Sequence, residues 1–207
     1  MLDCIASGTL WVDMKEMGVD VLISAPQKGW SSSPCAAQIM LSDKALARLE
    51  ETTSTSFACD LKKWFDIMRA YENGGHAYHA TMPTDALSKF RDTMVETQEY
   101  GFDKVKQEQQ ALGDAVRGML ETKGIHSVAA EGFKAPGVVV SYTNDPLMQN
   151  GKKFLEAGLQ TAAGVPLQCD EREDFATFRI GLFGLEKLHN PSDAVEKLES
   201  ALDKILS

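Results

Sequence analysis

The sequence predicts an α/β fold that ends in a smaller α+β domain, and three observations support this prediction. Two short apolar runs at residues 19–24 and 36–41 are closed by prolines and a glycine, as in strands of a mostly buried sheet. Apolar side chains then recur at helical spacing over 84–123. Strand-like and helix-like patterns alternate after that. We therefore expect three parts, with residues 1–83 as the remainder of a larger domain, 84–123 as bridging helices and 124–207 as the small domain.

Two helices are predicted within the first part, and each begins after a capping side chain. Ser42 precedes SDKALARLEE, and Asp60 precedes LKKWFDIMRAYE. One face of the second helix carries Leu61, Trp64, Phe65 and Met68. The segment 73–84 that follows is rich in glycine and histidine, so we expect an ordered loop or an extended passage there.

The bridging helices carry two apolar stripes, with a break expected at Gly101. The first stripe consists of Leu87, Phe90 and Met94, and the second of Val105, Leu112, Val116 and Met119. Both stripes are expected to lie in a hydrophobic core.

The small domain is predicted from five further segments. Residues 126–132, 135–143 and 176–184 have strand patterns, 145–161 has a helix pattern, and 190–207 forms a closing amphipathic helix. Asn190 or Ser192 is expected to cap this last helix.

Composition and charge exclude several classes of protein. The chain has 207 residues, 43% of them hydrophobic, and 21 basic against 30 acidic side chains give a net charge of −9. This balance disfavours binding to nucleic acid or to anionic membranes, and no apolar run approaches the roughly 18 residues of a membrane span. The four cysteines lie far apart with no CxxC pair, which disfavours zinc and a redox dithiol and favours reduced thiols in the cytoplasm. Small-molecule chemistry or protein partners remain.

Lys28 and Asp3 are candidates for chemistry at the strand ends. Lys28 follows the run 19–24 between Pro26 and Gly29, so its amine is able to point into a cleft. A lysine desolvated there becomes a nucleophile toward carbonyl groups. A carboxylate such as Asp3, facing the same cleft, is the charge partner that a pyridinium nitrogen requires. The alternatives are a solvated loop lysine and an aspartate that caps a turn.

Arg179 is a candidate for binding a substrate carboxylate. Strand alternation places Phe178, Ile180 and Leu182 on one face of the predicted strand, and Arg179, Gly181 and Phe183 on the other. The arginine therefore lies beside a glycine that leaves room for a ligand, and its planar fork binds carboxylates bidentately. The alternative is an internal ion pair with the acidic residues of EREDF, 171–175.

The segment 73–84 offers groups that suit a phosphate. Tyr78 and Thr81 supply hydroxyls and His79 supplies an imidazole. His76 and His79 also have a spacing that two metal ligands can use, but no acidic or cysteine partner is placed to complete a metal site. No GxSxG, GxGxxG or Walker A sequence is present, so serine-nucleophile, nicotinamide and nucleoside-triphosphate chemistry have no support.

Four strings in this order resemble the second half of the class V pyridoxal-phosphate-dependent aminotransferases of fold type I. They are similar in particular to the alanine/serine–glyoxylate (serine–pyruvate) aminotransferases. The strings are DCIASG at 3–8, VDVLISAPQKGW at 19–30, YHATMPT at 78–84 and FRIGLFG at 178–184. The resemblance implies the C-terminal part of a fold type I large domain followed by a small α+β domain.

The resemblance also implies a role for each candidate residue. Lys28 would be the catalytic residue that holds pyridoxal 5′-phosphate covalently, Asp3 would pair with its ring nitrogen, and Gln27 would line its pocket. Tyr78 and Thr81 would reach the phosphate held by the neighbouring subunit of a homodimer. Arg179 would hold the α-carboxylate of the substrate.

The activity implied is transfer of an amino group between a small amino acid, alanine or serine, and a 2-oxo acid, glyoxylate or pyruvate. Gly29 and Trp30 stand where the best-known glyoxylate enzymes have alanine and leucine, so the substrate pair stays open. The family's first half has no counterpart in the sequence, and we therefore expect a truncated aminotransferase.

Two alternatives remain. One is a pyridoxal-phosphate lyase similar to the cysteine desulfurases, although Gln27 precedes the lysine where those enzymes have histidine, and Cys169 lies among acidic residues. The other is a non-catalytic fragment that acts only in dimerisation.

Overall fold

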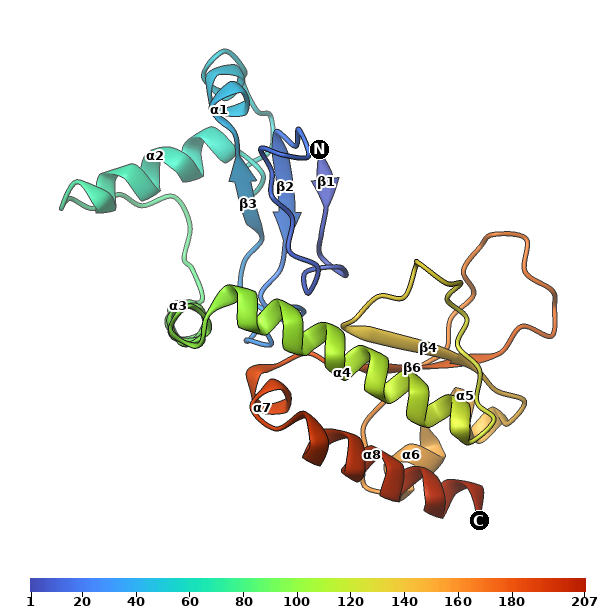
Figure 1. The fold of residues 1–207 in the computed structure, drawn as a ribbon. Helices are drawn as coiled ribbons and strands as arrows, with labels where there is room; N and C mark the ends of the chain where they lie inside the picture. The colour runs from blue at the N-terminus through green and yellow to red at the C-terminus, as the bar shows by residue number, and fades with distance from the viewer.

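The computed structural model describes residues 1–207 and contains two three-stranded sheets (Figure 1). The first sheet has the order β1–β2–β3 and consists of β1 (Leu2–Asp3), β2 (Val21–Ser24) and β3 (Gln38–Leu41). β1 runs parallel to β2, and β3 runs antiparallel to it. The strands predicted at 19–24 and 36–41 are confirmed as β2 and β3, each slightly shorter than its apolar run.

Two helices follow the first sheet, as predicted. They are α1 (Asp43–Glu50) and α2 (Leu61–Glu72). The Ser42 hydroxyl accepts a hydrogen bond from the Ala45 N–H, and the Asp60 carboxylate accepts one from the Lys63 N–H, so both predicted caps are confirmed. No residue of α2 is buried, so its apolar face lies outside the hydrophobic core of this chain.

The two long helices are α3 (Thr84–Tyr100) and α4 (Phe102–Thr122), and the break between them lies at Gly101, as predicted. α4 buries the second predicted stripe. α3 buries only Thr97, and Met94 of the first stripe is 41% exposed. Only the second stripe is therefore core.

The second sheet is antiparallel and has the order β4–β6–β5, with β4 (Val138–Tyr142), β5 (Ala162–Ala163) and β6 (Thr177–Gly181). Phe178 and Ile180 of β6 are buried and Arg179 between them is not, so the predicted alternation is confirmed. The strand predicted at 126–132 is wrong, because only one bridge forms, between Ser127 and Ser141. The Ser127 hydroxyl accepts a hydrogen bond from the Ala129 N–H, and this local turn ends the pairing.

Short helices and a long one complete the chain: α5 (Pro146–Gln149), α6 (Lys152–Glu156), α7 (Leu185–Leu188) and α8 (Pro191–Leu206). The single helix predicted at 145–161 is wrong, because the chain breaks at Gly151, whose φ of 81° is left-handed. The closing helix is confirmed, and the Asn190 side chain caps it by accepting from the Asp193 N–H.

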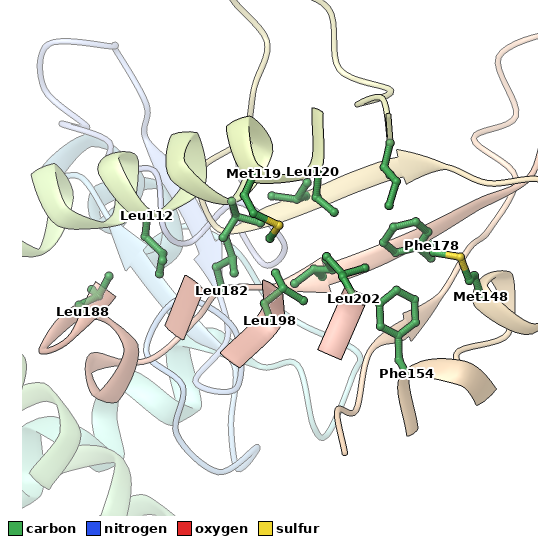
Figure 2. Close-up of a cluster of buried hydrophobic side chains, with 14 of the residues drawn as sticks. Leu112, Met119, Leu120, Met148, Phe154, Phe178, Leu182, Leu188, Leu198 and Leu202 are labelled. Carbon is green, nitrogen blue, oxygen red and sulfur yellow. The ribbon is translucent and has the colours of Figure 1, made fainter. Parts of the chain in front are cut away.

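The hydrophobic core lies between α4, α8 and the second sheet (Figure 2). Phe154 and Phe178 are fully buried with ring centroids 5.0 Å apart, and Leu112, Leu120 and Leu202 pack in the same cluster. Each such side chain contributes about 1.5–3 kcal/mol through burial. The core thus holds β6, the strand of Arg179, against two helices.

Aromatic rings join the first sheet to the long helices. The Trp11 ring lies 5.0 Å from the Phe102 ring of α4 and 5.6 Å from Trp30, and Trp30 lies 5.9 Å from Phe90 of α3. In Figure 1 the α3–α4 pair accordingly runs between the two sheets. None of the helices combines the length and the apolar character needed to span a membrane.

Candidate active site

Two parallel strands end at the same edge of the first sheet and carry the predicted cofactor residues. Asp3 is the last residue of β1 and lies opposite Ile23 of β2. The Cys4 N–H donates to the Ile23 carbonyl oxygen at 2.7 Å and extends the pairing by one residue. Lys28 lies in the turn that follows β2. Because parallel strands present their carboxyl ends at one edge, Asp3 and Lys28 belong to the same edge of the sheet.

Both charged groups at this edge are free to meet a ligand. Asp3 Oδ1 accepts a hydrogen bond from the Ile5 N–H at 2.9 Å, and neither Asp3 nor the half-buried Lys28 is in any of the ion pairs of the structure. The Lys28 carbonyl oxygen accepts from the Ser31 N–H at 2.9 Å, which closes the turn. Gln27 beside it is exposed. The edge therefore presents a carboxylate, an amine and an amide.

The turn of Lys28 packs backbone to backbone against the segment that follows β1. A Cβ atom on Gly29 would overlap the carbonyl group of Gly8. Ser24 Oγ donates to the Cys4 carbonyl oxygen at 3.5 Å in the same region. Glycine at position 29 thus allows the lysine turn and the aspartate strand to approach closely.

A mostly apolar cavity of about 250 Å³ adjoins this edge. Trp11, Trp30, Gln38 and Leu188 are among its lining residues, and Trp30 Nε1 donates to Gln38 Oε1 at 3.0 Å. Sequence patterns assigned no role to Trp11 and marked Trp30 only as a departure from the glyoxylate enzymes. A usable signal was the position of Trp30, two residues after Lys28 in the same turn.

Tyr78 and Thr81 lie together but form no hydrogen bond with the residues of the strand edge. The Tyr78 hydroxyl and Thr81 Oγ1 are 3.1 Å apart, both side chains are exposed, and neither forms a hydrogen bond with Asp3 or Lys28. Their segment passes from α2 to α3 (Figure 1). The structure thus pairs these two hydroxyls with each other.

Arg179 lies on the face of the second sheet opposite the core. Its Nε donates to the Ala163 carbonyl oxygen of β5 at 2.8 Å, and it forms no ion pair. The alternative of an internal ion pair is therefore wrong: within the acidic segment Arg172 pairs with Asp174 at 3.0 Å. The terminal nitrogens of Arg179 stay available for a carboxylate.

The loop before β6 is organised by Glu171. Its carboxylate accepts from the Gln168 N–H at 2.9 Å and from the Cys169 N–H at 2.8 Å. These backbone hydrogen bonds, that of Gln168 first, lower the pKa of Glu171 to about 2. The ionised side chain thus shapes the loop that leads to Arg179. No group of three or more His, Cys, Asp or Glu side chains is placed to hold a metal ion.

No protein-family model matches the sequence, but individual proteins do. An alanine–glyoxylate aminotransferase of Felis catus is 29% identical over 60% of this chain and 31% of its own length. One from Oryctolagus cuniculus is 27% identical over 100% of this chain and 52% of its own length. A protein of Synechococcus sp. named soluble hydrogenase, small subunit, is 24% identical over 99% of this chain and 52% of its own length.

Comparison with solved structures gives the same resemblance. An alanine–glyoxylate aminotransferase from Nostoc sp. superposes with a TM-score of 0.81 at 21% identity, over all of this chain and 53% of that chain. The resemblance and the fold class predicted from the sequence are confirmed. The chain spans at most about half the length of the proteins reported above. These proteins are named for different activities, so the role of this chain depends on its own residues.

Proposed function

We propose that this chain, which has the fold of half an alanine–glyoxylate aminotransferase, acts in pyridoxal-phosphate-dependent amino-group transfer. The observation that carries the proposal is the shared strand edge of Asp3 and Lys28. A carboxylate and an amine there are both free of ion-pair partners.

The residues at this edge fit the cofactor in their chemistry. An amine is needed for the covalent bond to an aldehyde, and a carboxylate is needed beside a protonated pyridine nitrogen. Lys28 and Asp3 supply them, and the Gly8–Gly29 contact leaves this wall without side chains. We assign Gln27, which is exposed beside Lys28, to the lining of the cofactor pocket. The bound cofactor supplies a ring that accepts electrons from the substrate carbon.

Each residue would then have a defined role in the reaction. The Lys28 amine would hold the cofactor covalently and, once the substrate amino group has displaced it, would act as general base at the Cα–H of the amino acid. Asp3 holds the proton on the pyridine nitrogen. Arg179 binds the α-carboxylate and so orients the Cα–H bond. A small amino acid, alanine or serine, and a 2-oxo acid, glyoxylate or pyruvate, are the proposed substrates.

The phosphate-binding residues are proposed to act across a homodimer. Tyr78 is 75% exposed, and the Tyr78–Thr81 pair makes no hydrogen bond to the edge that carries Lys28. We assign both hydroxyls to the cofactor held by a partner subunit. The proposed assembly therefore places each cofactor between two chains.

The test is covalent trapping. The 207-residue chain is incubated with pyridoxal phosphate, reduced with borohydride, digested and analysed by mass spectrometry. The expected result is a pyridoxyl adduct on Lys28, absent in Lys28→Arg and retained in the control Lys15→Arg, whose lysine is exposed. An unmodified Lys28 in the wild-type chain would contradict the proposal.

A second candidate role is dimerisation without catalysis. Large apolar side chains are exposed along the segment that contains α2, among them Phe57, Met68 and Tyr71. Such a surface favours association with another chain. A dimer by sedimentation combined with no trapped adduct supports this role over the enzymatic one.

A further inference from the structure

We propose that His79 is a positioning residue that fixes the segment 76–81 so that Tyr78 and Thr81 present their hydroxyls together to a phosphate. The inference rests on the proposed function, in which these two hydroxyls bind the cofactor phosphate. It concerns the element that holds the hydroxyls and not the hydroxyls themselves.

The segment 76–81 has no backbone support of its own. It contains neither helix nor strand, and none of its N–H or carbonyl groups forms a backbone–backbone hydrogen bond. The nearest such bonds are those of Gly75 with Ala70 and of Thr84 with Met82. Another contact must therefore set the path of the six residues between them.

His79 supplies the one hydrogen bond from this segment to the rest of the chain. Its Nε2 lies 2.9 Å from the Phe57 carbonyl oxygen. A carbonyl oxygen only accepts, so Nε2 carries the hydrogen and donates it. The bond joins two positions 22 residues apart, on either side of α2.

Two aromatic rings hold the imidazole as well. The Phe57 ring centroid lies 4.2 Å from that of His79, and the Trp64 ring lies 5.0 Å away, edge-on at 72°. Trp64 is itself fixed, because its Nε1 donates to the Ala58 carbonyl oxygen at 2.8 Å. We call Phe57, Trp64 and His79 the aromatic clamp.

The clamp acts on its immediate neighbours in the chain. Tyr78 precedes His79, and Thr81 lies two residues beyond it. The Tyr78 hydroxyl and Thr81 Oγ1 are 3.1 Å apart, close enough to donate to oxygens of one phosphate. Holding the segment before the ligand arrives removes part of the ordering cost of binding.

The test compares three variants of the 207-residue chain. His79→Leu removes the donor and the ring, and His79→Gln keeps a donor of similar reach. His76→Leu is the matched control, because His76 is exposed in the same segment and forms no hydrogen bond. Affinities for pyridoxal phosphate and for pyridoxal, which lacks the phosphate, are measured by equilibrium dialysis. Cleavage of the cofactor-free chain within 76–81 is measured with proteinase K.

The clamp predicts a loss specific to the phosphate. His79→Leu should bind pyridoxal phosphate about tenfold more weakly, with pyridoxal unaffected, and should be cut faster within 76–81. His79→Gln should recover part of both losses, and His76→Leu should match the wild type.

Two results would overturn the inference in different ways. If His79→Leu and the wild type bind pyridoxal phosphate equally well, or if His79→Leu loses as much affinity for pyridoxal as for pyridoxal phosphate, the role of His79 is contradicted but the proposed function is not. A wild-type chain that binds neither ligand contradicts the proposed function, and the inference falls with it.

Discussion

The side-chain amide of Gln109 on α4 donates to the carbonyl oxygen of Pro136, just before β4, at 3.1 Å. The same nitrogen lies 3.3 Å from the carbonyl oxygen of Leu182, just after β6, and donates to it as well. Gln109 is only 2% exposed. One buried amide thus ties the helix to the adjoining ends of two antiparallel strands, and it satisfies two carbonyl groups that water does not reach.

Replacing this amide should destabilise the fold. Gln109→Leu keeps the volume but leaves both carbonyl oxygens without their donor, which should lower the free energy of unfolding by about 1–3 kcal/mol. Gln110→Leu is the control, because Gln110 is exposed and bonds only to Asp114 on the same helix. Urea unfolding followed by circular dichroism measures both. Equal effects at the two positions would contradict this role of Gln109.

Alanine at position 29 should disturb the lysine turn. The new methyl group meets the backbone of Gly8, so Gly29→Ala should lower the free energy of unfolding by about 1–3 kcal/mol. Borohydride trapping on Lys28 should weaken as well. Gly118→Ala is the control, because nothing lies within 4 Å of its new Cβ on α4, and it should stabilise the chain by about 0.5–1 kcal/mol. A neutral Gly29→Ala would show that the two segments separate easily.

Arg179→Lys should weaken binding of the amino-acid substrate. Lysine lacks the planar guanidinium that donates two parallel hydrogen bonds to a carboxylate. The specificity constant for the amino acid should therefore fall by about 10–100-fold. The chain should stay folded, because Arg179 makes only one hydrogen bond, to Ala163. Arg172→Lys is the matched control, since Arg172 is exposed and pairs only with Asp174. Steady-state kinetics with alanine distinguish the two, and similar losses in both would argue against a carboxylate site at Arg179.

The loop before β6 should loosen in acid. Hydrogen bonds from the Gln168 and Cys169 N–H groups lower the pKa of Glu171 from 4.5 to about 2 in the folded chain. The folded state therefore favours the charged form, so this stabilisation is present above pH 4.5 and is lost as the pH falls toward 2. An NMR titration of the Glu171 carboxyl carbon should give this pKa directly.

Two variants test the role of Glu171 in this loop, and the second of them is the control. Glu171→Gln should remove the acid dependence of the Cys169 amide signal. Glu173→Gln should keep it, because Glu173 holds neither amide. An unshifted titration of Glu171 would contradict the capping role.

Much of the fold could be predicted from local signals, because these signals act within a few residues. The caps at Ser42, Asp60 and Asn190 and the break at Gly101 depend only on neighbouring side chains and backbone. The wrong predictions arose where two local signals favour different structures. Gly151 interrupts a helical pattern that hydrophobic spacing alone favours, and it does so in a left-handed conformation.

Burial and the site were predictable only in part. Both α2 and α4 carry an apolar face at helical spacing, yet only the face of α4 is buried, because burial depends on which surface lies opposite. Strand order was enough to place Asp3 and Lys28 at one edge. The contact of Gly29 with Gly8 and the hydrogen bond of His79 with Phe57 join positions more than 20 residues apart, and no local pattern reports such contacts.

The break at Gly101 has a consequence for substrate recognition. Lys28 is attached to the first sheet, whose loops touch α3 and the first residue of α4 through aromatic rings. Arg179 lies on β6, whose residues Phe178 and Ile180 share one core with α4. In the proposed site, the angle at which α3 meets α4 would help to set the distance between the Lys28 amine and the Arg179 guanidinium, and with it the length of amino acid that fits between them.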